Sequence, residues 1–403
     1  MIVRSLTRHI ITLACICGLM SFCIQAYATG QEERQSVVVG AERTEELLPL
    51  LRGKAVALVA NATSIVGPER EHLLDNLLRH GVQIMKVLGP EHGFRGDADA
   101  GATVRDDRDM KTGIPIVSLY GNNKKPTKGM LRDVDVVLFD MQDVGTRFFT
   151  YISTLHYVME ACAEQGKKLI VTDRPNPNDN IDGPILQPDC RSFVGLDPLP
   201  VLHGLTIGEL AQMINGERWL VKKSDKCDLT VIPMTGWKHG QPYILPVKPS
   251  PNLPTPQAIA WYPSLCLFEG TIMSIGRGTT FPFEVLGYHN ENFGDFTFTP
   301  RPIRGMDSNP LYKGRVCHGI DLRGVEAPKG FSLNLLIHFY RIAREEGLRF
   351  INRRQTFNIL AGTKELALQI EKGMSEEEIR ATWQPGLKKY RKMRQKYLLY
   401  PDQ

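Results

Sequence analysis

The chain has few of the motifs that mark a metal-dependent or nucleotide-dependent protein. Its eight cysteines include no CxxC pair, and no spacing of potential ligands indicates a metal site. It also lacks the GxxxxGK[ST] phosphate loop, the HExxH zinc motif and the GxSxG nucleophile elbow, so P-loop, zinc-peptidase and serine-hydrolase classes have no motif support. The net charge of +5 comes without a block of Lys or Arg, which argues against a nucleic-acid partner. We therefore expect a globular protein with no cofactor and no metal.

The first 28 residues have the pattern of a secretory signal peptide. Arg4 and Arg8 precede an apolar run over 10–24, and a small-x-small site ends at Ala28, so we expect cleavage there and export to the periplasm. The alternative is a membrane anchor, but the run is shorter than the ~20 apolar residues that cross a bilayer. A lipid anchor at Cys23 is disfavoured by the bulky residue before it. Cleavage removes two arginines and no acid, which lowers the net charge to +3 and leaves no expected transmembrane anchor.

Five cysteines remain after that cleavage. Their number is odd and their spacing is wide, so they do not form a disulfide framework even in an oxidising compartment. We expect most of them to be buried free thiols that pack as small apolar side chains. They are Cys162, Cys190, Cys227, Cys266 and Cys317.

Apolar strands alternate with helices over residues 36–240, which predicts a Rossmann-like α/β domain. Strands that are apolar throughout are typical of a parallel sheet covered by helices on both faces. Helices are expected over 68–80 and 149–165, and from a capping box at Thr206 to about Asn215. Strands are expected over 54–61, 82–88, 114–119, 134–139, 168–172 and 229–234.

The rest of the chain predicts a junction and a smaller mixed α/β domain. Seven prolines fall between residues 241 and 263, and they predict an irregular linker that packs along the domain junction. Residues 264–403 then form the C-terminal domain. It is expected to contain an amphipathic helix over 331–346 and a capped helix that begins after Ser375 and breaks near Pro385.

Acidic residues follow three of the predicted strands, at the edge where an open parallel sheet binds its ligands. The most informative is Glu91, which lies with His92 in a glycine-flanked loop after the strand over 82–88. Partial burial there would raise the pKa of the carboxyl group and keep it protonated, as a general acid requires. The alternative is a loop glutamate that pairs with Arg95 or another cation.

The second acidic segment contains Asp140 and Asp143 at the end of the strand over 134–139. An acid at the end of an apolar strand is costly unless it is used or paired, which makes Asp140 the better catalytic candidate. Asp143 is also suited to cap the helix that follows. Arg147 can clamp a substrate carboxylate with two hydrogen bonds, or pair with one of these acids.

The third segment contains Asp173, Arg174 and Asn176 in a proline-rich loop after the strand over 168–172. These side chains offer a dense set of hydrogen-bonding groups for a sugar. The alternative is a turn that is stabilised by its own side-chain-to-backbone bonds.

A loop over residues 276–284 repeats this combination of charge and glycine in the second half of the chain. It contains Arg277 and Glu284. It lacks the third glycine of GxGxxG and no strand clearly precedes it, so we do not expect it to bind a nucleotide.

These segments resemble the NamZ family, the exo-acting β-N-acetylmuramidases of bacterial peptidoglycan recycling. The resemblance implies a Rossmann-like domain joined to a smaller α/β domain with the active cleft between them. It also implies removal of β-1,4-linked N-acetylmuramic acid from the non-reducing end of glycan fragments, and it places the candidate catalytic glutamate on Glu91. The similar stretches cover the chain after the signal peptide nearly end to end: GPEHGFRGDADAG (89–101), VDVVLFDMQDVGTRFFTYISTL (134–155), LIVTDRPNPN (169–178), FVGLDPLPVLHGLTIGELAQMINGE (193–217), PSPNLPT (249–255), YPSLCLFEGTIMSIGRGTTFPFEVLG (262–287) and KYLLY (396–400).

Glycosidases need a protonated acid at the leaving oxygen and usually a second carboxylate as base or nucleophile. The hypothesis is that Glu91 is the acid, that His92 orients it and that Asp140 is the second carboxylate. One of the arginines Arg147, Arg174 and Arg277 would bind the lactyl carboxylate of the sugar, and assistance by its 2-acetamido group is a further route. Asp143, Asp173 and Glu284 are reserves for the second carboxylate, and the expected substrate-binding residues are Asp143, Arg147, Asp173, Arg174, Asn176, Arg277 and Glu284.

Two other classes of protein remain open from the sequence. A periplasmic muropeptide- or sugar-binding protein also has two α/β domains around a cleft, although its site would favour aromatic stacking over crowded acids. A cell-wall esterase or amidase is disfavoured by the missing nucleophile elbow.

Overall fold

The structure is a computed structural model that describes residues 36–90, 94, 107–121, 123–221 and 226–402. The expected signal peptide, Glu91 and His92 lie outside these described residues. The five cysteines named above are all buried and free, as predicted.

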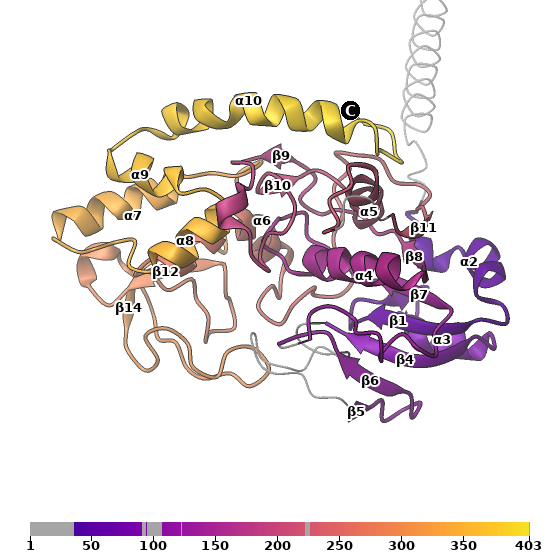
Figure 1. Cartoon of the computed structure of the whole chain (residues 1–403). Helices are drawn as coiled ribbons and strands as arrows, with labels where there is room; N and C mark the ends of the chain where they lie inside the picture. Colours follow the sequence, from indigo (N-terminus) through magenta and orange to yellow (C-terminus); the bar gives the residue numbers. More distant parts are fainter. Residues whose placement is uncertain (1–35, 91–93, 95–106, 122, 222–225, 403) are drawn as a thin grey trace, which may run out of the picture.

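A seven-stranded sheet in the order β11-β8-β7-β1-β4-β6-β5 forms the centre of the first half (Figure 1). Six strands run parallel, and the short edge strand β5 (Asp107–Arg108) pairs antiparallel to β6. The order reverses on either side of β1, so the carboxyl ends of β1 and β7 flank the point where such sheets bind ligands. The parallel strands are β1 (Ala55–Ala60), β4 (Gln83–Gly89), β6 (Pro115–Ser118), β7 (Val136–Asp140), β8 (Lys168–Thr172) and β11 (Asp228–Ile232). They confirm the Rossmann-like prediction.

Helices cover both faces of this sheet because alternate strand residues point to opposite sides. Ala57 and Val59 of β1 pack in one apolar cluster with helices α4 (Tyr151–Gln165) and α5 (Ile207–Gly216). Val56, Leu58 and Ala60 pack in a second cluster with α2 (Thr44–Leu51) and α3 (Leu73–Arg79). The first cluster continues without a break into the second half of the chain, so the two halves share one core.

Helix α3 is shorter than the predicted helix over 68–80. The residues of its expected first turn instead lie in the turn and second strand of a hairpin formed by β2 (Ile65–Val66) and β3 (Glu71–His72). His72 caps the helix by accepting a hydrogen bond from the backbone N–H of Leu74. The capping boxes predicted at Thr206 and Ser375 are both present.

Helices form at two places where proline was expected to prevent them, the end of the stretch 241–263 and Pro385. Helix α6 (Pro256–Leu265) begins inside the proline-rich stretch, with Thr255 as its N-cap and Pro256 at its first position, where no N–H is needed. Pro263 lies inside the helix and frees the carbonyl of Ile259, which accepts a hydrogen bond from the Asn178 side chain at 3.0 Å. The break expected at Pro385 is likewise absent, because α10 (Glu376–Arg394) continues through it.

The second half forms a smaller α/β layer, as predicted. A short antiparallel sheet in the order β12-β14-β13 pairs Val285–Tyr288, Cys317–Asp321 and Phe296–Phe298. The helices around it are η3 (Cys266–Gly270), α7 (Asn334–Glu345), α8 (Arg354–Ala361) and α9 (Glu365–Glu371).

The last helix returns from the second half to the first. In Figure 1, α10 runs across the strand pair β9 (Ile181–Asp182) and β10 (Leu202–His203). The buried Tyr390 hydroxyl donates to the carbonyl of His203 at 2.7 Å, and Arg394 donates to the carbonyl of Gly204. The chain end is therefore fixed to the sheet domain.

Candidate active site

Asp140 is the last residue of β7 and is completely buried. Both carboxylate oxygens accept a hydrogen bond from the Arg174 guanidinium at 2.8 Å, and Thr172 donates to one of them at 2.7 Å. Burial opposes the charge on Arg174, but the Asp140 carboxylate outweighs it and raises the pKa of the guanidinium. An acid at the end of a strand can be catalytic or can be the partner of a cation, and the geometry of Asp140 fits a charge partner of Arg174.

Asp143 and Asn176 hold the neighbouring loops together. Asp143 accepts a hydrogen bond from the backbone N–H of Gly145 at 2.7 Å and contacts His203 Nε2 at 3.2 Å. The prediction that Asp143 caps the next helix is wrong, because α4 has Thr150 as its N-cap. A Cβ atom on residue 145 would lie 2.1 Å from the side-chain amide oxygen of Asn176, so only glycine fits at this position.

Asp173 lies under the C-terminal segment and is also completely buried. It accepts hydrogen bonds from the hydroxyls of Thr206 and Tyr400 and from the backbone N–H of Gly208, the last at 2.8 Å. Burial, with the nearby Glu209 charge, raises the pKa of Asp173 to about 7. Its bonds fix the start of α5 and the KYLLY segment, so it too serves the scaffold in this structure.

A second charge cluster lies beside the same segment. His239 contacts Asp179 and Glu209 through its two ring nitrogens, each at 3.0 Å. Burial alone would lower the pKa of His239, but hydrogen bonds to the two carboxylates outweigh it and raise that pKa to about 9. Arg394 completes the cluster with an ion pair to Asp402 at 2.7 Å.

Arg147 takes neither of the roles that the sequence suggested. Its side chain is fully buried, and the guanidinium donates to three backbone carbonyls, those of Pro184, Leu199 and Leu360, at 2.8 to 2.9 Å. Burial lowers the pKa of Arg147 to about 9. Because Leu360 belongs to α8, this arginine joins the two halves of the chain.

Arg277 lies instead at a cavity of about 150 Å³ between the two halves. Its Nε and Nη2 donate to the same oxygen of Glu269 at 3.1 and 2.6 Å, and the guanidinium lies 5.2 Å from the ring centroid of Phe283. Burial would lower the pKa of Arg277, but Glu269 outweighs it and raises that pKa. The side chains of this pair are 25% and 30% exposed, so the pair is open to a ligand. The cavity is lined by Phe148, Phe149, Thr150, Tyr151, Val194, Ser250, Asn252, Leu253, Tyr262, Cys266, Glu269, Arg277, Phe283 and Leu360.

Glu284 is buried and bonds to the Thr255 hydroxyl, which also caps α6. It therefore secures the helix that forms one wall of the cavity. Glu269 was not among the predicted site residues, although it lies in the stretch 262–287 that resembles the family, because it does not follow a predicted strand. It belongs to η3 and is brought to Arg277 by the turn that follows.

The predicted site residues therefore separate into two groups. Asp140, Asp143, Asp173, Arg174 and Asn176 form a bonded scaffold at the carboxyl edge of the sheet, whereas Arg277 lies in the cavity. The chain that leads to Glu91 leaves β4 at Gly89, at the same edge as β7 and β8. In the part of the chain that the structure describes, no cluster of His, Cys, Asp and Glu could hold a metal ion, and no helix is long and apolar enough to cross a membrane.

Comparison with known proteins gives matches along almost the full length. Two family models, "Exo-β-N-acetylmuramidase NamZ, N-terminal" and "C-terminal", match residues 56–257 and 260–400. The peptidoglycan β-N-acetylmuramidase NamZ of Bacillus subtilis (strain 168) is 39% identical over 96% of this chain and 99% of that protein. Two crystal structures of DUF1343 family proteins from Bacteroides fragilis NCTC 9343 are also similar. One is 42% identical with a TM-score of 0.83 over 92% of this chain and 100% of its own, and the other is 32% identical with a TM-score of 0.76 over 90% and 99%.

Proposed function

The chain belongs to the NamZ family of exo-β-N-acetylmuramidases, and we propose that it removes β-1,4-linked N-acetylmuramic acid from the non-reducing end of peptidoglycan fragments. This proposal is supported by the match of both family models, in order, and by a β-N-acetylmuramidase that aligns over nearly the whole of both chains. The chain is accordingly a glycoside hydrolase. The binding-protein and esterase alternatives are set aside.

Glu91 is the proposed general acid, and His92 the residue that orients it. The support comes from sequence position: Glu91 comes two residues after the end of β4, and β4 pairs with β1, one of the two strands that flank the point where the sheet order reverses. A protonated carboxyl group there can give its proton to the glycosidic oxygen as the bond to the sugar breaks.

Asp140 is reassigned in this proposal from second carboxylate to charge partner of Arg174. To act as base or nucleophile it would have to leave the guanidinium, and an unpaired buried charge costs about 3–5 kcal/mol. Asp173 and Glu284 are similarly buried and bonded. Asp143 is buried as well, with its Oδ2 bonded to Gly145 and His203 and its Oδ1 without a hydrogen-bond partner among the described residues. We therefore assign all four to the support of the site.

Arg277 is the proposed binding group for the lactyl carboxylate, which distinguishes N-acetylmuramic acid from N-acetylglucosamine. The donors of Arg147 and Arg174 are directed at backbone carbonyls and Asp140, whereas Arg277 is partly exposed in the cavity. Glu269 holds the guanidinium in place, and the aromatic rings beside it offer the apolar face of a sugar a packing surface. A guanidinium fixed in this way can bind a carboxylate with two parallel hydrogen bonds.

The acid assignment is tested by the release of N-acetylmuramic acid from a disaccharide with that sugar at its non-reducing end. Glu91→Gln is expected to lower kcat by ~10²–10⁴-fold, whereas Glu69→Gln, at an exposed glutamate, leaves it unchanged. Release that survives Glu91→Gln would assign the acid to another residue.

The selectivity assignment is tested by Arg277→Met. We expect a rise in KM for the muramide that is at least tenfold larger than any change for the matching glucosaminide, since a charge-assisted bond contributes about 1.5–3 kcal/mol. Glu269→Gln is expected to change KM in the same direction by less. Equal effects on both sugars would contradict recognition of the lactyl group by Arg277.

Export to the periplasm is a further part of the proposal, supported by the basic, apolar and small-residue regions of residues 1–28. The mature N-terminus is then Thr29. The intact mass of the protein recovered from a periplasmic extract tests this, and an uncleaved chain in the cytosolic fraction would contradict it.

A further inference from the structure

Two of the five buried cysteines lie at the same end of the sheet. Cys162 is in the last turn of α4, and its carbonyl accepts hydrogen bonds from the N–H groups of Gly166 and Lys167, the turn that leads into β8. Cys227 comes immediately before β11, whose first residue, Asp228, is the register partner of the first residue of β8. The two cysteines therefore flank the starts of adjacent parallel strands.

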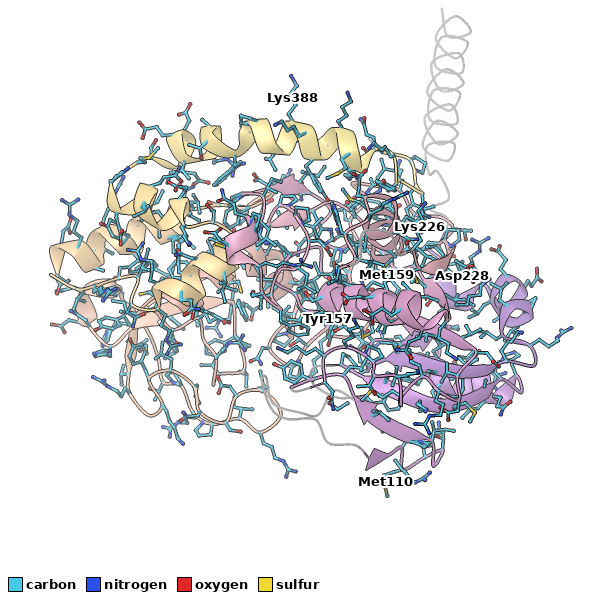
Figure 2. All side chains as sticks on the ribbon, viewed as in Figure 1. Met110, Tyr157, Met159, Lys226, Asp228 and Lys388 are labelled. Atoms are coloured by element: carbon cyan, nitrogen blue, oxygen red, sulfur yellow. The ribbon has the colours of Figure 1, made fainter. Side chains whose placement is uncertain are left out.

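The position of Cys227 is fixed from the other side by α5. The Asn215 side chain donates to the carbonyl of Cys227 at 3.0 Å and accepts from its N–H at 2.9 Å. Figure 2 labels Met159, three residues before Cys162 on α4, and the two residues that flank Cys227. The side chains of Cys162 and Cys227 both belong to the main apolar cluster, and they are 0% and 4% exposed.

The two thiols are also in direct contact. A hydrogen bond joins the Cys162 and Cys227 side chains, and this bond, with burial, raises the pKa of Cys162. The other three cysteines lie in other elements. Cys190 ends η2 (Pro188–Cys190), Cys266 begins η3 and Cys317 begins β14.

We propose that Cys162 and Cys227 are a paired oxidation site that closes into a disulfide when the chain folds in the presence of a small-molecule disulfide. One cysteine thiolate attacks the added disulfide RS–SR, forms a mixed disulfide and releases RSH. The second cysteine then attacks the mixed disulfide, so that the Cys162–Cys227 bond forms and a second RSH leaves. The two protein thiols are oxidised, the added disulfide is reduced to two thiols, and the two protons end on those thiols.

The folded environment determines when this reaction occurs. Because both thiols are buried, an added disulfide reaches them slowly once the core is closed, and we expect the bond to form while the chain folds. Once formed, it ties the end of α4 to the edge strand β11 and closes a long loop, which limits the freedom of the unfolded chain. Formation of this bond does not depend on the proposed activity.

The test uses the full chain, unfolded and refolded in a buffer of reduced and oxidised glutathione, then alkylated in denaturant and digested without reductant. Mass spectrometry is expected to find the peptides of Cys162 and Cys227 joined, and dithiothreitol to separate them. The joined form is also expected to have a Tm higher by on the order of 5 °C. The control Cys190→Ala keeps the cross-link, whereas Cys162→Ala and Cys227→Ala each abolish it.

Full alkylation of both cysteines after refolding in oxidised glutathione would overturn the proposal. So would a cross-link that joins either cysteine to one of the other buried cysteines in place of its partner. If an alanine variant fails to fold, peptide mapping of the unsubstituted chain still decides between these results.

Discussion

Replacing Asp140 with asparagine separates a structural role for this residue from a catalytic one. The Asp140–Arg174 pair is 0% and 3% exposed, and it is closed by two hydrogen bonds of 2.8 Å. Asn keeps the shape but removes the negative charge, so Arg174 stays buried without a counter-ion. Breaking a buried pair in this way costs about 3–5 kcal/mol, which lowers the urea midpoint by about 1–2 M for an m-value of ~3 kcal/mol per M.

The assay is urea unfolding followed by tryptophan fluorescence, together with kcat for muramide hydrolysis in the absence of urea. The pair of Lys364 and Asp189, whose side chains are 60% and 50% exposed, provides the control, since Asp189→Asn should leave the urea midpoint nearly unchanged. The double variant Asp140→Asn with Arg174→Met removes the orphaned charge, and it is expected to recover at least half of the lost stability.

The reverse pattern of results would identify Asp140 as a catalytic residue. If Asp140→Asn unfolds at the same urea concentration as the unsubstituted chain while kcat falls by ~10²–10⁴-fold, then Asp140 is a catalytic carboxylate after all. We expect a folded variant whose kcat remains within about tenfold of the starting value.

Three further predictions follow from the buried polar groups. Arg147→Lys cannot supply the planar fork that reaches three carbonyls, and we expect a loss of about 2–4 kcal/mol in urea unfolding. Tyr400→Phe removes the hydroxyl that donates to Asp173 and accepts from the N–H of Met234, and should cost about 1–3 kcal/mol, measured in the same way. Asp173 and His239 bind their protons more tightly in the folded state, so their contribution to folding stability is complete at low pH and is lost as the pH rises. For Asp173 the loss occurs between pH 3.8 and about pH 7, and for His239 between pH 6.5 and about pH 9. Urea midpoints should therefore fall between pH 6 and pH 9.5, and a midpoint that rises over this range would contradict the assignment.

The fold was predictable wherever local pattern and tertiary environment agree. The strands of the central sheet are short apolar runs between polar turns, so their positions and parallel arrangement could be predicted from the sequence. The boxes at Thr206 and Ser375 were predictable because a helix cap needs only residues close in sequence. Pro263 was misjudged because the carbonyl that it frees is satisfied by Asn178, a residue from a distant loop.

The site was less predictable, because its bonds depend on residues that are far apart. The sequence indicates that Asp140 ends a strand, but its partner Arg174 follows the neighbouring strand β8, and only the sheet order brings the two together. Arg147 bonds to a carbonyl 213 residues away, which no spacing rule anticipates. Glu269 was missed for a different reason: its partner Arg277 is only eight residues away, but nothing in the local sequence distinguishes this glutamate from an ordinary surface one.

Hydrolysis of 4-nitrophenyl β-N-acetylmuramide by the unsubstituted chain, measured beside the matching N-acetylglucosaminide, decides whether the chain is a muramidase. We expect release of nitrophenol from the muramide with little or none from the glucosaminide, since only the muramide carries the lactyl carboxylate. No release from the muramide, or equal release from both sugars, would contradict the assignment of the chain as an exo-β-N-acetylmuramidase that selects its sugar through this group.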